Sequence, residues 1–184
     1  IDENKKHISA YMNFRDKYLV FEDVRKFGRF YLFRNMDYLN NKLGVEPLEN
    51  DFSESWLLQN IKKRNRQIKS LLLDQSFVCG IGNIYADEAL WYAKIHPQTI
   101  SSSISRKKII KLRIGIIKVL KESIKRGGTT IRDYTYDFSY VGNYALKLNV
   151  FGKEGSSCPR CHSLIIKTKV SQRGTHYCVK CQKK

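Results

Sequence analysis

Four cysteines near the C-terminus form the pattern that most specifically indicates a chemistry in this sequence. They stand in two Cys-x2-Cys pairs with sixteen residues between the pairs: Cys158, Cys161, Cys178 and Cys181. Four thiolates at this spacing suit one Zn²⁺ ion, because zinc prefers soft ligands and closes its shell with four of them in a tetrahedron. A ribbon over residues 148–184 has too little core to fold without such a staple. We predict one structural zinc ion there.

Two other residues that could bind a metal are not expected to belong to this site. His162 directly follows Cys161, and we interpret it as a loop residue because four cysteines already fill the zinc shell. Cys79 stands in a mostly apolar stretch, where a free cysteine behaves as a small buried hydrophobe. A disulfide framework is not expected at this length and spacing.

The charge of the chain favours a polyanionic partner. Lysine and arginine number 34 against 17 acidic residues, which gives a formal net charge of +17. Such an excess attracts nucleic acid first and an anionic membrane surface second. No apolar run approaches the roughly 20 residues that a spanning helix needs, and no signal segment opens the chain. We therefore expect an intracellular DNA-binding monomer, cytoplasmic and associated with the nucleoid.

The ribbon carries a candidate DNA contact of its own. We expect one strand over residues 165–170, a turn at Arg173 and Gly174, and a return strand over residues 176–178. Eight basic residues and one acidic residue lie between Lys153 and Lys184. An arginine at the tip of such a hairpin would enter a groove or grip phosphates.

A glycine-rich string, residues 80–83, opens a predicted helix. Gly80 and Gly82 let the backbone approach a partner closely, and a helix N-terminus offers free amides to a phosphate. Asn83 fits the N-cap position of this helix. An ordinary turn between two helices explains the same residues, so the string alone does not decide the function.

A second basic and aromatic string lies at residues 23–29, DVRKFGR. On an extended strand Arg25 and Phe27 point to the same side. The pair suits a wedge, in which Phe27 unstacks bases and Arg25 reads a base edge. The alternative is an ordinary strand with an exposed arginine.

Periodicity predicts the elements that position these residues. Strands are expected within residues 8–34, a connection over 35–50, and a helix that starts with a capping box at Asp51 and Glu54. Further helices are expected over 65–73, from Asn83 to about Lys94, and from near Ser105 to a C-cap at Gly127 and Gly128, followed by a loop over 131–147. The helix from Ser105 has one apolar stripe, whose residues are Ile109, Leu112, Ile116, Ile117, Leu120 and Ile124. Its many lysines and arginines are interpreted as a solvated face.

These strings together resemble the formamidopyrimidine-DNA glycosylase family, repair enzymes that remove oxidised purines. The matching strings, in order, are DVRKFGR, GVEPLENDF, GIGNIYADEALWYAKIHP, GGTTIRDY and the cysteine ribbon that closes on TKVSQRGTHYCVKCQ. The resemblance covers nearly the whole chain and implies an α+β fold. Residues 1–34 would be the end of an N-terminal β sandwich, 35–50 a linker, 51–147 a helix-two-turn-helix domain and 148–184 the zinc ribbon.

The resemblance also implies roles for single residues. Arg25 and Phe27 resemble the residues that fill and wedge the gap left by a flipped base. Asn83 resembles the phosphate-binding asparagine of the helix hairpin, and Arg173 the zinc-finger arginine that grips phosphates beside the lesion. Arg132 is placed among the DNA contacts, in a segment over 129–144 that resembles the loop covering an everted oxidised purine. Base flipping brings the sugar carbon to the nucleophile.

The chain departs from the family pattern at its start. The family nucleophile is an N-terminal proline, whose amine forms an imine with the sugar carbon, and a glutamate follows it. Ile1, Asp2 and Glu3 do not reproduce that motif, and Val24 stands where the family often has proline. We expect no catalytic residue within these 184 residues: the chain binds damaged duplex DNA without turnover, and glycosylase and β,δ-elimination activity belong to an intact enzyme with an upstream segment.

Two alternatives remain open from the sequence. One is a naturally short, noncatalytic zinc-ribbon protein that keeps the DNA-binding elements. The other is the sister branch that prefers oxidised pyrimidines, although RKFG and SQRGTHYC look more like the purine branch.

Overall fold

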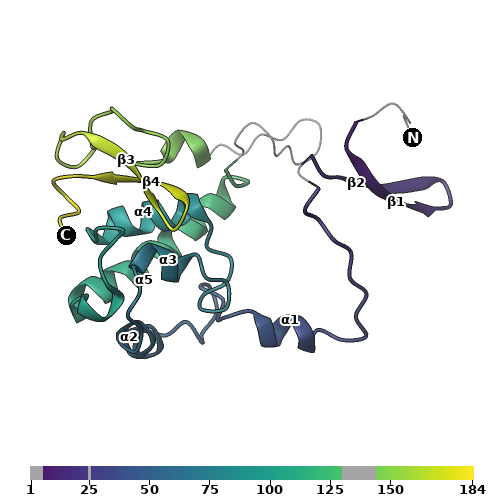
Figure 1. Ribbon diagram of the computed structural model, residues 1–184, viewed down its shortest axis with the longest axis horizontal. Coiled ribbons are helices and arrows are strands. Elements are labelled where there is room, and N and C mark those ends of the chain that lie inside the picture. The colour runs from purple at the N-terminus through teal and green to yellow at the C-terminus, as the bar shows by residue number, and fades with distance from the viewer. Residues whose placement is uncertain (1–5, 25, 130–143) are drawn as a thin grey trace. The chain divides into compact units, whose positions relative to one another are not determined.

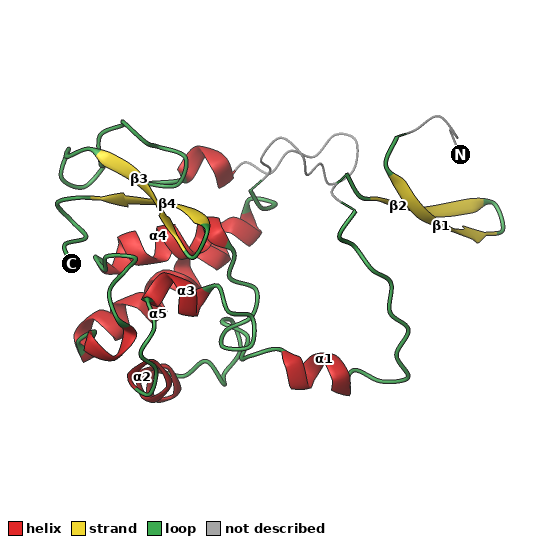
Figure 2. Cartoon of the chain, viewed as in Figure 1, coloured by secondary structure: helices red, strands yellow, loops and turns green. Residues whose placement is uncertain are grey.

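The computed structural model describes residues 6–24, 26–129 and 144–184 (Figure 1). The chain divides into two units, Ile1–Tyr38 and Leu39–Lys184, which are described separately. Helices and small two-stranded sheets make up the described residues (Figure 2). The mixed α and β content agrees with the predicted fold class, and the described part of the first unit contains one two-stranded sheet.

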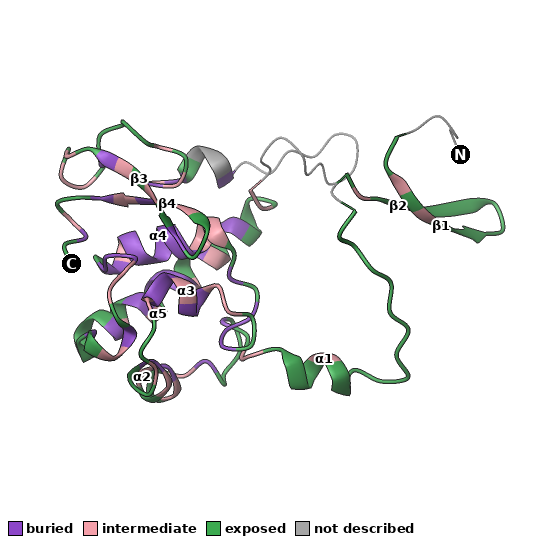
Figure 3. Cartoon of the chain, viewed as in Figure 1, coloured by how far each residue is buried: buried purple, intermediate pink, exposed green. Residues whose placement is uncertain are grey.

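The first unit is built on an antiparallel hairpin. Strands β1 (Ile8–Phe14) and β2 (Lys17–Glu22) pair with Phe14 opposite Lys17, so a two-residue turn joins them. Most of their side chains are exposed (Figure 3). Strands were predicted within residues 8–34, but residues 30–33 form none. That stretch is irregular and has ring contacts, such as Phe21 with Phe30 at 4.9 Å between centroids.

The segment after β2 turns instead of continuing as a strand. Lys26 has a φ of 56°, in the left-handed region, and the Gly28 amide donates to the Asp23 carboxylate at 2.6 Å. The prediction of an extended strand through Phe27 was therefore wrong, because the side chain of Asp23 caps a local turn. Arg25 lies outside the described residues.

Five α-helices and two 3₁₀ helices occur among the described residues. Helix α1 (Asp37–Lys42) falls in the predicted connection and crosses the boundary between the units. The others all belong to the second unit: α2 (Glu54–Lys62), α3 (Ile68–Leu72), α4 (Asn83–Ala93), η1 (Ser101–Ser103), α5 (Arg106–Lys125) and η2 (Tyr144–Lys147). Helix η2 replaces part of the predicted loop over 131–147, and residues 130–143 are not described.

Three helix N-caps were predicted. The structure corrects those of α2 and α4 and agrees with that of α5. Helix α2 is capped by Ser53, whose hydroxyl accepts from the Trp56 amide at 3.1 Å, and not by Asp51. Ser53 lies three residues before Trp56, the spacing at which a side chain reaches an unsatisfied first-turn amide. Gly82 occupies the N-cap of α4, so Asn83 is the first helical residue and its side chain is free to act elsewhere. Ser105 precedes α5 as predicted.

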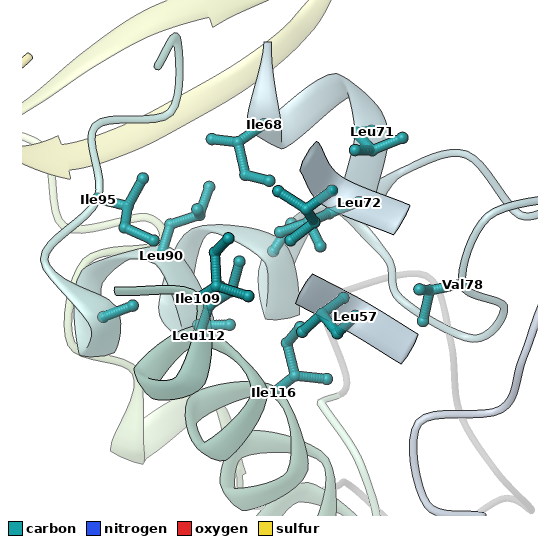
Figure 4. Packing of buried hydrophobic residues seen from close by; sticks show 14 of the residues in the cluster. Leu57, Ile68, Leu71, Leu72, Val78, Leu90, Ile95, Ile109, Leu112 and Ile116 are labelled. Carbon is teal, nitrogen blue, oxygen red and sulfur yellow. The ribbon is translucent and has the colours of Figure 1, made fainter. Parts of the chain in front are cut away.

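Helices α2 to α5 share one hydrophobic core (Figure 4). Ile109, Leu112 and Ile116 of α5 point toward Leu57 of α2 and Leu90 of α4. This side of α5 follows the predicted stripe, with Ile117 and Leu120 packed at its margin. Ile124 is 66% exposed, so the stripe ends at Leu120, one turn earlier than predicted.

Two turns join α3 to α4 over residues 73–82. Phe77 and Val78 donate their amides to the Asp74 carbonyl, and the Asp74 carboxylate accepts from the amide and hydroxyl of Ser76. The Ser76 hydroxyl and Arg66 lower the pKa of Asp74. Gln75 closes the second turn: its side chain accepts from the Gly80 amide at 2.9 Å and donates to the Ile81 carbonyl at 3.1 Å.

The C-terminal ribbon is a hairpin of β3 (Ile165–Val170) and β4 (Arg173–Cys178). Ser171 and Gln172 form the turn, with φ of 48° and 63°. Positive φ at both central positions is typical of the two-residue turn that matches strand twist. The predicted turn at Arg173 and Gly174 was therefore shifted by two residues, and Arg173 begins β4 opposite Val170.

The contrast between Ile116 and Ile124 gives a stability test within one helix. Ile116 is 2% exposed and Ile124 66% exposed. Ile116→Ala should lower the free energy of unfolding by about 2–5 kcal/mol, because it leaves a cavity in the core. Ile124→Ala should change it by less than about 0.5 kcal/mol. Urea titration followed by circular dichroism measures both, and equal effects would contradict the assigned core.

Candidate metal centre and nucleic-acid interface

The four predicted zinc ligands meet in the ribbon. The sulfurs of Cys158, Cys161, Cys178 and Cys181 all lie within 4.8 Å of one another. Three of their separations are 3.3 Å, 3.4 Å and 4.0 Å. A tetrahedral zinc with Zn–S bonds of about 2.3 Å places its sulfurs about 3.8 Å apart. The donor set and its spacing therefore fit one zinc ion.

Hydrogen bonds to individual sulfurs favour the thiolate form, whereas burial and the crowding of the sulfurs oppose it. The Trp91 indole donates to Cys158 Sγ at 3.4 Å, and the Cys181 amide donates to Cys178 Sγ at 3.4 Å. Hydrogen bonding from the Ser163 backbone amide lowers the pKa of Cys161 to about 6. Burial and the neighbouring sulfurs raise the pKa of Cys181 to about 12. Four adjacent thiolates repel one another, so a shared cation is what permits all four to ionise.

The metal centre is fixed to helix α4 and to the segment that follows it. Gln182 is fully buried; its side chain accepts from the Cys178 amide and donates to the Ile95 carbonyl, both at 2.9 Å. Arg160 stacks over the Trp91 ring at 4.0 Å and donates to the Trp91 carbonyl at 3.0 Å. Gln182 was recognised from the sequence only as the end of a motif; its two hydrogen bonds show why a side-chain amide is needed there.

A buried carboxylate of α4 holds the chain entering the ribbon. Glu88 is 1% exposed and accepts from the backbone amides of Asn149, Val150 and Phe151 at 2.8–3.0 Å. The Asn149 side chain adds a further bond at 2.8 Å. Three amides converging on one carboxylate satisfy a charge that would otherwise be costly to bury.

One predicted DNA contact, Asn83, is hydrogen-bonded to the residue that follows another, Arg173. The Asn83 side chain, at the start of α4, donates to the Gly174 carbonyl at 3.0 Å. Arg173, which precedes Gly174, is exposed. The structure thus joins the N-terminus of α4 to the first residues of β4, although the two segments lie about 90 residues apart in the sequence.

The glycines before α4 differ in their structural need. Gly80 has a φ of 77°, which favours glycine. Gly82 has φ −96° and ψ −179°, a conformation open to any residue, and a Cβ built there meets nothing within 4 Å. The fold itself does not require glycine at position 82. Close approach of an external group to the first amides of α4 would require it.

A buried ion pair that was not predicted from the sequence lies beneath this interface. Lys69 of α3 and Asp87 of α4 are both fully buried, with Nζ and Oδ1 2.7 Å apart. Lys69 also donates to the Gly174 carbonyl and the Thr175 hydroxyl. A lysine next to Ile68 within an apolar stretch was the available signal, but its partners come from α4 and β4 and are not evident from spacing.

The remaining predicted contacts lie in the first unit or outside the described residues. Phe27 belongs to the first unit and is 77% exposed. Arg25 and Arg132 lie outside the described residues. Cys79 is buried away from the cysteine cluster, with its thiol 3.6 Å from the Val45 carbonyl, and burial raises its pKa.

Comparison with known proteins gives consistent matches over the chain. Residues 43–135 match the family described as the formamidopyrimidine-DNA glycosylase H2TH domain, and residues 155–184 match a zinc finger found in FPG and IleRS. A formamidopyrimidine-DNA glycosylase of Bacillus licheniformis is 42% identical over 97% of this chain and 67% of its own length. The chain thus spans about two thirds of that relative.

Solved structures show the same likeness. A mutant of the Lactococcus lactis protein, in complex with DNA containing Fapy-dG, is 41% identical with a TM-score of 0.90. The Lactococcus lactis protein in complex with abasic-site DNA is 40% identical with the same score. Each match covers 98% of this chain and 68% of the other. In the part of the chain that the structure describes, no helix has the length and apolar content needed to cross a bilayer.

The zinc centre generates a test with a matched cysteine control. Cys181→Ser should reduce bound zinc well below one equivalent, and hydrogen exchange should accelerate over β3 and β4 because the ribbon has little core of its own. Helix α5 should stay protected, since its core excludes the ribbon. Cys79→Ser should retain one zinc. Mass spectrometry of the native protein measures the metal, and full occupancy in Cys181→Ser would contradict the four-sulfur site.

Proposed function

The chain belongs to the formamidopyrimidine-DNA glycosylase family, and we propose on that premise that its 184 residues hold damaged duplex DNA in a base-excision repair enzyme that removes oxidised purines. One observation carries the proposal. The Asn83 side chain, at the N-terminus of α4, donates to the carbonyl of Gly174, the residue that follows Arg173 at the start of β4. Two groups suited to binding phosphate, the first amides of α4 and the Arg173 guanidinium, therefore belong to segments that are in contact.

The start of α4 has the features of a phosphate seat. Its first amides have no helical partner, and the helix dipole favours an anion at this end. Among the described residues, no atom lies within 4 Å of a Cβ built at Gly82, which leaves open space beside these amides. Asn83 donates one side-chain hydrogen bond to Gly174, so its position is fixed before DNA arrives. We assign Asn83 as a phosphate contact through this end of the helix.

Arg173 is the second proposed phosphate contact. A guanidinium offers several donors in a rigid fork that matches phosphate oxygens. The side chain is exposed. The backbone after it is held in place, because the Gly174 carbonyl is hydrogen-bonded and Thr175 is fully buried. The high exposure of Phe27 supports its proposed role as a wedge, and Arg25 and Arg132 are proposed contacts on the family resemblance alone.

The proposed substrate is a duplex with an oxidised purine, such as 8-oxoguanine or a formamidopyrimidine. The Lactococcus lactis relatives, solved with Fapy-dG and abasic-site DNA, support this class of lesion. In the intact enzyme the base is removed and the backbone is cut by β,δ-elimination through an imine. One Zn²⁺ would supply no chemistry; Cys158, Cys161, Cys178 and Cys181 would hold it to keep the ribbon folded.

We further propose that the 184 residues alone bind DNA without forming the imine. Lysine amines can form imines, but Lys69, one of the lysines near Gly174, is fully buried and paired with Asp87. An ammonium held in this way has no free electron pair for attack on a sugar carbon.

The phosphate contacts predict a salt-dependent defect. Arg173→Ala should weaken DNA binding by about tenfold or more, because a charge-assisted hydrogen bond is lost, and equally on all sequences. The slope of log affinity against log salt should fall by about one. Lys180→Ala, an exposed cation beyond the hairpin, is the control and should change affinity less than threefold. Fluorescence anisotropy at four salt concentrations measures both; equal effects, or a flat salt response, would count against this interface.

If the 184 residues form no imine with DNA, borohydride should trap no covalent protein–DNA adduct. The 184-residue polypeptide is mixed with a duplex bearing one 8-oxoguanine or one abasic site, and borohydride is added. No protein–DNA adduct should appear in the mass spectrum, while the same mixture binds DNA by anisotropy. The Bacillus licheniformis relative serves as the positive control for trapping. An adduct of the 184-residue polypeptide would refute the proposed lack of turnover and would identify the nucleophile by peptide mapping.

A further inference from the structure

The buried ion pair of Lys69 and Asp87 needs an explanation beyond stability. Both side chains are fully buried, and their charged atoms lie 2.7 Å apart. Desolvating two charges costs about as much as their attraction returns, and well-packed apolar replacements are often as stable or more so. A pair of this kind is best explained by a geometry that apolar side chains cannot enforce.

The partners of the pair show which geometry it enforces. Lys69 Nζ donates to the Gly174 carbonyl at 3.0 Å and to the Thr175 hydroxyl at 2.7 Å. The Asp87 carboxylate accepts from the His176 amide at 2.8 Å. These bonds fall on three consecutive residues of β4, directly after Arg173. The Thr175 hydroxyl in turn donates to the Arg173 carbonyl at 2.9 Å.

The turn of the hairpin is tied to the same helix. The hydroxyl of Ser70, next to Lys69 on α3, is hydrogen-bonded to the hydroxyl of Ser171 in the turn. Helix α3 therefore holds the chain both before and after Arg173, and α4 holds it through Asn83 and Asp87. The exposed guanidinium extends from a backbone that is fixed on both sides.

We propose that Lys69 and Asp87 are positioning residues for DNA binding, which fix the start of β4 so that Arg173 meets the same stretch of DNA backbone as the N-terminus of α4. Neither residue touches DNA, because both side chains are fully buried. The inference rests on the proposed function, in which Arg173 contacts a phosphate. It extends that function to residues that do not contact DNA: two buried charges, on α3 and α4, set the position of the arginine on β4.

Charge gives the pair a second effect on the same residue. Burial lowers the pKa of Lys69, Asp87 opposes that shift, and the charge of Arg173 adds to the lowering. Arg173 and Lys69 are thus like charges that sense each other. Asp87 offsets their repulsion, and its loss would push the guanidinium away from the helix end.

A charge-neutral swap separates positioning from stability. Lys69→Met combined with Asp87→Leu keeps similar volumes and leaves no unpaired buried charge, so it should retain one zinc and a Tm within a few degrees of the parent. The Thr175 hydroxyl loses its donor Lys69, and the His176 amide loses its acceptor Asp87. Binding to a duplex with one tetrahydrofuran abasic analogue should weaken about tenfold, and the salt slope should fall by about one.

A double-mutant cycle with Arg173 identifies the route of the effect. The swap is measured in the parent and in Arg173→Ala. If the pair acts through Arg173, the swap should cost less than twofold once Arg173 is alanine. An equal loss in both backgrounds, or no loss in the parent, would overturn the inference while leaving the proposed function intact. No effect of Arg173→Ala itself would overturn both.

A gentler variant keeps the inference testable if the swap fails to fold. Thr175→Val removes one hydroxyl, which accepts from Lys69 and donates to the Arg173 carbonyl. It should weaken DNA binding severalfold in the parent but not in Arg173→Ala. Thr175→Ser restores the hydroxyl and should restore affinity. Equal affinity of Thr175→Val and the parent would contradict the positioning role.

Discussion

Buried carboxylates on helix α4 must be satisfied, and this constraint organises the second unit. Asp87 and Glu88 are adjacent and almost fully buried, yet they serve different segments. Glu88 binds the amides at residues 149–151, which lead into the ribbon, and Asp87 binds the His176 amide and the Lys69 ammonium. A buried carboxylate without such partners would be strongly unfavourable, so the ribbon docks where its amides reach both.

Zinc and the buried carboxylates contribute differently to the interface: zinc stabilises the ribbon, and the carboxylates orient it. The four sulfurs supply the internal core that a short hairpin lacks. Folding of the ribbon alone would leave its direction free, because a metal centre fixes only the chain around it. Asp87, Glu88 and Gln182 fix that direction by bonding the ribbon to α4 and the residues after it. Zinc binding stabilises the folded hairpin that contains β4, and the hydrogen bonds to α4 set the position of Arg173.

The features that sequence predicted well are those set by local chemistry. Cysteine spacing, the apolar stripe of α5 and the start of that helix at Ser105 each follow from residues close together in the chain. The errors arose where several local solutions compete. Ser53 and Asp51 both offer an N-cap, and only the helix register selects Ser53. Gly174 suggested the hairpin turn, whereas Ser171 and Gln172 adopt positive φ because strand pairing places them there.

The interface beneath Arg173 was unpredictable for a stronger reason. Lys69 and Asp87 are 18 residues apart, on separate helices, and their shared target is a strand about 90 residues further on. Nothing in a helical period distinguishes a lysine that meets a buried aspartate from one that reaches solvent. The three-dimensional arrangement explains the Lys69–Asp87 pair in electrostatic terms. A polyanion-binding site gathers like charges, which repel before the ligand arrives, and a compensating carboxylate below the surface lets these cations be held in place in advance. Preorganisation of this kind lowers the cost of ordering the arginine when a phosphate arrives.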